Sequence, residues 1–300
     1  MKDGENTTAR LGCLAVVFLF YDIWECVAST SATPQWRCVF IMKTDCLIAY
    51  GSNLGDSDRW FAQICSDWKA DQRISALKAS SLITTAPIGT GNSEKQNPYR
   101  NGCIRFTFAE CQDALFKLLR DTELKFGRQR RERWGSRTVD LDLLLFGSQK
   151  HDSSDLKVPH PRMTFRRFVL EPAAEIASEM THPWSSWSIE QHLDCLDTRP
   201  DSVVIVFPQK ADTDDEQVAL QKQLTEFEKL GWQILFRSDG DLPVPKTTKL
   251  LVFTGQLSSE LLDSARKFPG ATLNSSSETG QFNIGEVAAA IEAMRPLSKT

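Results

Sequence analysis

The sequence predicts an α+β fold in which helices cover an antiparallel-rich sheet, followed by a small α/β unit. Two observations support this prediction. Between residues 46 and 146, strand-like apolar segments alternate with segments of helical periodicity, but without the regular strand–helix count of a barrel. Residues 199–300 also alternate strands and helices, and this segment is much shorter than the ~250 residues of a typical (β/α)₈ barrel.

In the first half of the chain, each element follows from a local pattern. Strands are expected at residues 46–53, 74–87, 103–110 and 138–146, and helices at residues 56–70 and 111–126. Helical spacing of Trp60, Ile64 and Trp68 supports the first helix. Gly127 is a candidate C-cap for the second helix, and Pro87 ends the second strand. Residues 88–102 are rich in Gly, Asn, Ser and Pro, so an exposed loop is expected there.

The second half begins after "LDTRPDS", which is typical of a linker. Strands are expected at residues 202–208, 232–236 and 249–255, and helices at residues 215–230, 258–268 and 285–294. This region contains no phosphate-binding loop fingerprint, metal-ligand cluster or catalytic set that we recognise. We therefore expect a domain of unknown function at residues 199–300, and a chain ending near Arg199 is expected to fold and turn over without it.

The N-terminal residues 1–41 contain one apolar run, Leu11 to Tyr21, of 11 residues. A membrane-spanning helix needs ~20 residues, so no such helix is expected. Three interpretations stay open: an upstream extension before a natural start at Met42, a targeting leader, and a structural element. The acidic residues on both sides of the run favour the extension. The main domain is then expected at residues 42–198.

Charge and cysteine content limit the possible functions. The formal net charge of −4 argues against a general nucleic-acid binder, whereas a local basic cluster points to a small anionic ligand. None of the 8 cysteines forms a CxxC pair, and the 4 histidines show no zinc-like spacing. Free thiols in a reducing compartment, and hence a cytoplasmic protein, are the expectation.

Two aspartates stand at the start of an otherwise apolar strand. Asp140 and Asp142 are two residues apart, so their side chains project from one face while Leu141 and Leu143 project from the other. Two ionised carboxylates this close repel each other, and a hard cation resolves the conflict. Mg²⁺ is commonly held by one or two carboxylates together with substrate phosphates. Neutralisation by nearby arginines is the structural alternative.

A basic loop precedes this strand, and its arginines are Arg128, Arg130, Arg131, Arg133 and Arg137. Five guanidiniums exceed the charge of two aspartates, and the excess suits a polyphosphate. Trp134 lies among them and offers a ring for stacking. A solvated loop and a nucleic-acid-binding loop remain open as alternatives.

Two further segments offer binding groups. His160 lies between two prolines, near Arg162, Arg166 and Arg167, and is followed by Phe168. Thr85, Tyr99 and Asn101 lie in or next to the loop at residues 88–102. A ring to stack on and an amide to donate and accept hydrogen bonds would suit a planar ligand.

With these segments in view, the chain resembles the 6-hydroxymethyl-7,8-dihydropterin pyrophosphokinase family. "RWGSRTVDLDLL", Arg133 to Leu144, fits the family signature at every position, and "YGSNLGD", "TAPIG…NPYRN" and "VPHPRMTFRRF" occur in the family's order. The resemblance covers roughly residues 44–185. It implies a ferredoxin-like sandwich, ATP as co-substrate, two Mg²⁺ ions, and transfer of pyrophosphate to the pterin hydroxymethyl group with release of AMP. Its implied partners are these small molecules, with neither nucleic acid nor membrane.

The resemblance also implies roles for individual residues. Asp140 and Asp142 would bind the metal. The nucleotide side would comprise Glu123, Arg128, Arg130, Trp134, Arg137, His160 and Arg166, with Arg128 and Arg137 acting on the transferred group. Tyr99 and Phe168 would sandwich the pterin, Asn101 would hydrogen-bond its edge, and Thr85 and Ile88 would lie nearby.

The chain departs from the family pattern at Ala86, where a second proline is common, and at Pro161, where an aromatic or polar residue is common. Neither position touches the aspartate pair. Two other function classes are weighed against the pyrophosphokinase. A non-catalytic RNA- or nucleotide-binding module would not need the aspartates, and a two-metal nucleotidyltransferase would release pyrophosphate instead of AMP.

Overall fold

The structure is a computed structural model, and it describes residues 43–88, 96–127, 138–153, 155–207, 227–238, 245–253, 259–268, 270–274 and 284–297, with residues 222, 224 and 225. Residues 1–42 and residues 43–300 are separate units by their internal contacts. The interpretations of residues 1–41 therefore concern a part of the chain outside the described residues. Most of the helix predicted at residues 215–230 also lies outside the described residues.

The first sheet is antiparallel, as predicted. Its elements follow in the order β1 (Thr44–Ser52), α1 (Ser57–Lys69), β2 (Ile74–Ala79), β3 (Ile83–Thr85), β4 (Tyr99–Phe108), α2 (Gln112–Lys125) and β5 (Asp140–Phe146). The strands are ordered β2-β4-β1-β5, with β3 also paired to β4. All of these pairings are antiparallel. The central strands β4 and β1 therefore separate β2 from β5.

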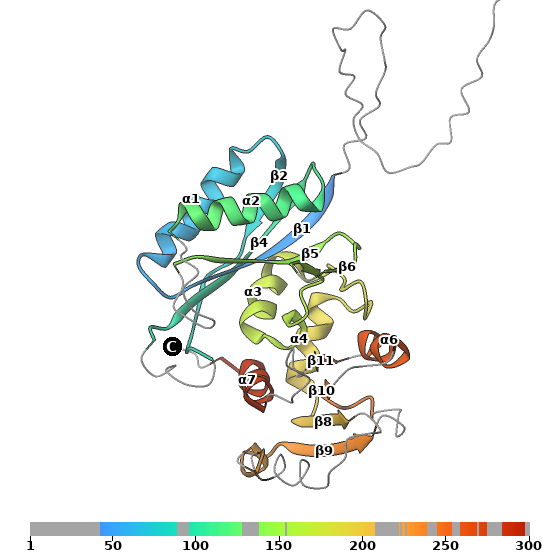
Figure 1. The fold of residues 1–300 in the computed structure, drawn as a ribbon. Helices are drawn as coiled ribbons and strands as arrows, with labels where there is room; N and C mark the ends of the chain where they lie inside the picture. Colours follow the sequence, from blue (N-terminus) through green and yellow to red (C-terminus); the bar gives the residue numbers. More distant parts are fainter. Residues whose placement is uncertain are drawn as a thin grey trace, which may run out of the picture. The chain divides into compact units, whose positions relative to one another are not determined.

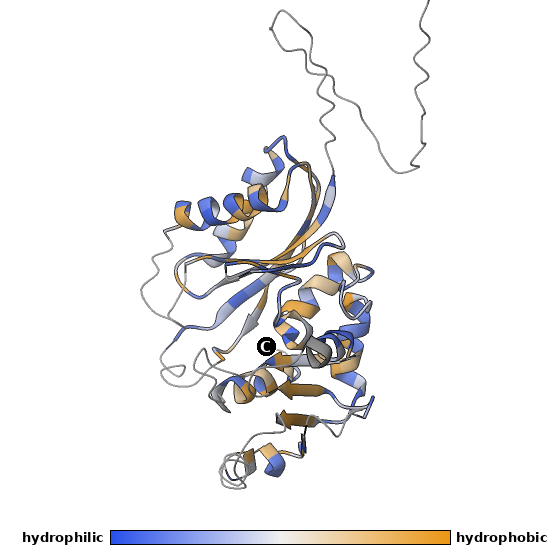
Figure 2. Ribbon diagram, turned by 45° about the vertical axis from the view of Figure 1, so that its right-hand side comes forward, coloured by the Kyte–Doolittle hydropathy of each residue, from blue (hydrophilic) through white to orange (hydrophobic). Residues whose placement is uncertain are grey.

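Helices α1 and α2 cover one face of this sheet (Figure 1). The Asp56 side chain accepts a hydrogen bond from the backbone N–H of Arg59 and so caps the start of α1. Gly127 adopts a positive φ of 79° just after α2, as the predicted C-cap requires. The indole N–H of Trp68 donates to the Thr122 hydroxyl at 3.2 Å and joins the two helices. Hydrophilic and hydrophobic residues alternate along both helices (Figure 2).

One predicted strand, residues 74–87, is divided into β2 and β3. The ladder with β4 shifts register between Ser75 and Lys78, where Ala76 adopts a positive φ of 53°. Ser80 follows the break and bonds Cys103 twice, because its backbone N–H donates to the Cys103 carbonyl and its hydroxyl accepts the Cys103 N–H. Sequence periodicity does not reveal such an irregularity, since the apolar pattern continues across it.

The opposite face of the sheet is covered by a segment that we did not predict as helical. The segment comprises β6 (His151–Asp152), β7 (Lys157–Val158), the 3₁₀ helix η2 (Met163–Phe165), α3 (Arg167–Ala177) and α4 (Ile189–Thr198). Of these elements, α3 covers the sheet face, α4 packs on α3, and Val158 of β7 belongs to the apolar cluster on the α1 and α2 side. Pro172 lies inside α3, and prolines and arginines hide the helical pattern of this region. Helix α3 packs against β4 and begins with the residues "RFVLEP", with Arg166 as its N-cap.

A second sheet follows, and its strands are all parallel. The elements are β8 (Ser202–Phe207), β9 (Gln233–Ser238), β10 (Leu250–Phe253), α6 (Ser259–Lys267), β11 (Ala271–Asn274) and α7 (Ile284–Met294). The strand order is β11-β10-β8-β9. Strand β11 was not predicted. Apart from Ser202 at the start of β8, strands β8 and β10 are apolar, as buried parallel strands commonly are (Figure 2).

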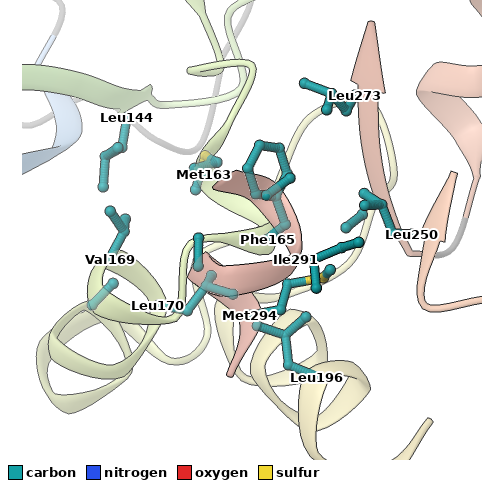
Figure 3. Close-up of a cluster of buried hydrophobic side chains, with 14 of the residues drawn as sticks. Leu144, Met163, Phe165, Val169, Leu170, Leu196, Leu250, Leu273, Ile291 and Met294 are labelled. Carbon is teal, nitrogen blue, oxygen red and sulfur yellow. The ribbon is translucent and has the colours of Figure 1, made fainter. Parts of the chain in front are cut away.

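One apolar core joins α3 to the second sheet. Met163 and Phe165 of η2 and Leu170 of α3 are each at most 3% exposed. Their side chains point toward Ile291 and Met294 of α7, with Leu250 and Leu273 of the parallel strands beside them (Figure 3). The domain boundary near residue 199 stays a prediction, but the segments on its two sides share a core.

Two further observations concern the described residues. The five cysteines among them, Cys46, Cys65, Cys103, Cys111 and Cys195, are all free thiols. No helix in this part of the chain has the length and apolar character that a membrane crossing requires.

Candidate active site

The predicted aspartate pair lies on the sheet face that carries α3. Asp140 and Asp142 are partly exposed, whereas Leu141 and Leu143 between and after them are buried. Leu141 and Leu143 belong to the apolar cluster beneath α1 and α2, so the aspartates project from the opposite face. The predicted division of this strand between carboxylate and apolar faces is confirmed.

Asn101 and Asp140 are brought together by the central strand. In the sheet register, Gly51 of β1 pairs with Asn101 of β4 on one side and with Asp140 of β5 on the other. A Cβ atom added at Gly51 would lie 3.6 Å from the Asn101 Oδ1 and 3.9 Å from the Asp140 Cβ. Gly51 therefore puts no side chain between an amide and a carboxylate, a role that the sequence did not reveal.

The side chain of Asn101 is oriented by its neighbour on β3. Its Nδ2 donates to the Thr85 Oγ1 at 2.8 Å, and both residues are buried. The remaining polar atom of the amide, Oδ1, is the one that faces the space above Gly51. Tyr99 lies two residues before Asn101 on the same strand, and its hydroxyl donates to the Gln96 Oε1 at 3.4 Å.

Asn53 is a second residue that the sequence analysis missed as a candidate. It is 4% exposed and lies just after β1. Its Nδ2 donates at 3.4 Å to both the Gln96 Oε1 and the Asn97 carbonyl. Asn53 thus fastens the segment before Tyr99 to the end of β1. The sequence contains a signal for it, because Asn53 belongs to "YGSNLGD", a motif that the chain shares with the family it resembles.

His160 reaches the aspartates from the segment that follows β7. Its backbone N–H donates to the Leu144 carbonyl at 3.0 Å, which docks the segment on β5. The imidazole Nδ1 accepts the Arg162 backbone N–H at 3.1 Å, so in the neutral ring the proton resides on Nε2. That Nε2 lies 3.8 Å from the Asp142 Oδ2.

The charge state of His160 follows from its surroundings. Burial, followed by the positive charges of Arg166 and Arg162, lowers the pKa of His160 to about 3, against a smaller opposing effect of Asp140. The imidazole is therefore neutral near pH 7. It can donate one hydrogen bond through Nε2 but adds no charge to the site.

Arg166 and Phe168 complete the described part of the site. The Arg166 Nη1 lies 3.8 Å from the Asp142 Oδ2, and its Cζ lies 5.6 Å from the centre of the Phe168 ring. Phe168 and Ile88 are partly buried and both pack against the core beneath α3. The guanidinium and the ring thus border the same sheet face as the aspartates.

Glu123 occupies a different position, on α2. The residue is 6% exposed, and its Oε1 accepts the backbone N–H of Leu141 at 2.9 Å. The hydrogen bond holds the strand at the residue between the two aspartates. The predicted contact of Glu123 with a nucleotide stays a prediction, whereas its contact with β5 is part of the structure.

Four predicted residues, Arg128, Arg130, Trp134 and Arg137, lie outside the described residues. Of the ten other predicted site residues, nine come from strands or segments that border the α3 face of the sheet. The tenth, Glu123, contacts β5 from the α2 side.

The donor set fits a hard cation that shares its ligands with a substrate. Within the described ranges, no group of three or more His, Cys, Asp and Glu side chains could enclose a metal ion. Two partly exposed carboxylates on one sheet face remain, Asp140 and Asp142. Mg²⁺ accepts such a set, because it keeps several waters and takes its other ligands from substrate phosphates.

Comparisons with known proteins identify one enzyme family. A family model described as 7,8-dihydro-6-hydroxymethylpterin-pyrophosphokinase (HPPK) matches residues 47–178. The 2-amino-4-hydroxy-6-hydroxymethyldihydropteridine pyrophosphokinase of Bacillus subtilis is 35% identical over 144 residues, which are 48% of this chain and 84% of that protein. The protein of that name from Synechocystis is 41% identical over 102 residues, which are 34% of this chain and 52% of that protein.

Among solved structures, Plasmodium falciparum HPPK-DHPS with pteroate has a TM-score of 0.39 at 10% identity, covering 73% of this chain and 58% of that chain. The family match ends at residue 178. The parallel sheet and α7 therefore lie beyond it.

Proposed function

The chain belongs to the 7,8-dihydro-6-hydroxymethylpterin-pyrophosphokinase family, and from that premise we propose that it transfers pyrophosphate from ATP to 6-hydroxymethyl-7,8-dihydropterin. The products are AMP and the pterin diphosphate, in folate biosynthesis. The observation that carries the proposal is the row of Asn101, Gly51 and Asp140 across three strands. It puts an amide suited to a pterin edge beside a carboxylate suited to a phosphate-bound metal.

In the proposed reaction, the pterin hydroxyl oxygen attacks the β-phosphorus of ATP in line. The bond from that phosphorus to the α,β-bridging oxygen breaks, AMP departs with the bridging oxygen, and the hydroxyl proton is released. Such transfers depend mainly on positioning and on electrostatic stabilisation. A covalent enzyme intermediate is therefore not expected.

Asp140 and Asp142 are the proposed metal ligands, for two Mg²⁺ ions. When bound there, Mg²⁺ would neutralise phosphate charge and align the phosphate chain. The neutral imidazole of His160 would donate from Nε2, and Arg166 would supply positive charge beside Asp142. Glu123 and the residues at 128–137, namely Arg128, Arg130, Trp134 and Arg137, are proposed for the nucleotide side on the motif match alone.

The pterin is proposed to lie above Gly51. Tyr99 and Phe168 would stack on its two faces, and the Asn101 amide would bind its edge. Thr85 supports this assignment because its hydroxyl already orients that amide. Ile88 packs on the same core as Phe168 and would border the ring.

We also infer a ferredoxin-like sandwich for residues 44–146, supported by the strand order β2-β4-β1-β5 and by two helices on one face. A cytoplasmic location is proposed as well, and the five free thiols support it.

The test is to incubate the protein with ATP, Mg²⁺ and 6-hydroxymethyl-7,8-dihydropterin and to identify the nucleotide product. AMP that forms only in the presence of the pterin and Mg²⁺ is the expected result. Release of pyrophosphate would indicate nucleotidyl transfer instead. Folded protein that binds ATP without forming AMP would indicate a binding module on the same scaffold.

A further inference from the structure

Helix α7 contacts the segment that carries His160, although α7 lies more than a hundred residues further along the chain. The Arg162 Nη2 donates to the Glu286 Oε1 at 2.8 Å. The two side chains are largely buried, with 27% and 12% of their surfaces exposed. Glu286 lies in the first turn of α7, where the helix dipole favours a carboxylate.

Arg162 is also the residue that orients His160. Its backbone N–H donates to the His160 Nδ1, which leaves the Nε2 of that ring directed toward Asp142. The side chain of Arg162 is held by Glu286 while its backbone holds the imidazole. A continuous series of contacts therefore runs from α7 to the candidate metal ligand.

The other end of α7 holds the same segment from a second side. The Arg167 Nε donates to the Met294 carbonyl at 3.1 Å, and the Arg167 Nη2 donates to the Asp197 Oδ1 at 2.6 Å. Arg167 lies between Arg166 and Phe168, and its side chain is 5% exposed. Residues 162–167 are thus attached to α7 at both of its ends, with the shared core between them (Figure 3).

We infer that Glu286 is a positioning residue for the nucleotide side of the active site, acting through Arg162 on His160. The inference rests on the proposed function and extends it to a part of the chain beyond the family match. Removal of the Glu286 charge leaves the buried Arg162 guanidinium without this carboxylate, which is costly for a buried ion pair. The Arg162 side chain then changes conformation to reach other acceptors, and the Arg162 backbone N–H that orients His160 moves with it.

The test compares Glu286→Gln with Glu292→Gln. Glu292 lies on the same helix and is paired with Arg295 at 3.0 Å, but its side chain is 49% exposed and far along α7 from Arg162. Both variants lose one carboxylate from α7. We expect Glu286→Gln to raise the KM for ATP about tenfold with a smaller change in kcat, because a misplacement of about 1 Å can cost about a hundredfold and the expected shift is smaller. Glu292→Gln should match the wild type.

Two further measurements separate positioning from a general loss of structure. Glu286→Asp keeps the charge and should restore most of the ATP affinity. Calorimetric binding of a non-hydrolysable ATP analogue with Mg²⁺ should be weakened in Glu286→Gln, at a temperature where the variant is folded. If Glu286→Gln and Glu292→Gln have equal ATP affinities, the inference is wrong. If wild-type protein forms no AMP, the proposed function fails, and the binding experiment still tests whether Glu286 affects nucleotide affinity.

Discussion

Asn101 and Asp140 face each other across Gly51, a residue that pairs with both of them in the sheet. The two side chains belong to strands that are not neighbours, and the central strand has no side chain between them. The Asn101 Oδ1 lies 3.6 Å from the position that a Gly51 Cβ would occupy. The proposed pterin and metal positions are therefore neighbours on one sheet face.

Gly51→Ala is predicted to reduce catalysis without loss of stability. The new methyl group meets Asn101 and Asp140 at ordinary contact distances, and alanine is about 0.5–1 kcal/mol more favourable than glycine inside a strand. It fills the space above β1, so kcat/KM for the pterin should fall about ten- to a hundredfold. Steady-state kinetics and thermal unfolding check both parts. A fully active Gly51→Ala enzyme would show that the substrate lies elsewhere.

Asp142→Ala is predicted to lower turnover by several orders of magnitude while the protein stays folded. Asp142 is partly exposed and stands near Asp140, so its removal relieves like-charge repulsion and exposes little new apolar surface. Magnesium-dependent AMP formation and the thermal midpoint are the measurements. Substantial activity in the Asp142→Ala enzyme would overturn the metal assignment.

Glu123→Ala is predicted to destabilise the protein by about 1–3 kcal/mol, because the buried Leu141 N–H loses its acceptor. Glu123→Gln keeps an oxygen acceptor for the Leu141 N–H, so it should lose less stability than Glu123→Ala. Asp121→Ala is the matched control on the same helix, since Asp121 is exposed and pairs only with Lys117 among the interactions of the described residues. Urea unfolding compares the three variants. Equal stabilities for Glu123→Ala and Asp121→Ala would contradict the prediction.

Stability is predicted to fall between pH 7 and pH 5 because three buried histidines, His160, His182 and His192, have lowered pKa values. Burial lowers the pKa of His182 to about 4 and that of His192 to about 3, and Ser185 lies between their rings. In the unfolded chain all three have pKa values near 6.5. The unfolded state therefore binds more protons over this range, and stability rises with pH up to about 6.5 and is constant above it.

At pH 5 each histidine should lower the free energy of unfolding by about 2 kcal/mol relative to pH 7. Urea unfolding at pH 7 and pH 5 measures the difference. The variant His182→Asn cannot titrate in this range, and its pH dependence should be smaller than that of the wild type by the contribution of one histidine. Identical pH dependences for the variant and the wild type would mean that His182 is protonated at no cost in the folded protein.

A chain ending at Arg199 is predicted to be strongly destabilised. This reverses the expectation from the sequence, because Met163, Phe165 and Leu170 pack on α7 and the parallel sheet. Full burial of such a side chain contributes about 1.5–3 kcal/mol, so their exposure removes several kcal/mol. Solubility and thermal unfolding of the shortened chain test this. A chain beginning at Met42 is the control and should unfold like the full chain; a stable, active chain ending at Arg199 would restore the original expectation.

Local patterns in the sequence were sufficient for the first sheet, its two covering helices and the aspartate pair. Period-two alternation and helical spacing are local properties, and Asp140, Leu141 and Asp142 have their faces set by strand geometry alone. The motifs also identified His160, Arg166 and Phe168 as candidates. Local periodicity failed for α3, where prolines and arginines conceal the helical period. It also failed for β2 and β3, where a local irregularity interrupts a continuous apolar pattern.

Which residues meet depends on how the strands pair and the helices pack. Asn101 and Asp140 are 39 positions apart and become neighbours through the register of two strands with Gly51. Arg162 and Glu286 are 124 positions apart and meet because α7 packs beside η2. Residue types and their spacing are enough to identify which side chains could do the chemistry. Their assembly depends on strand pairing and shared core packing, which are non-local and leave no periodic signal in the chain.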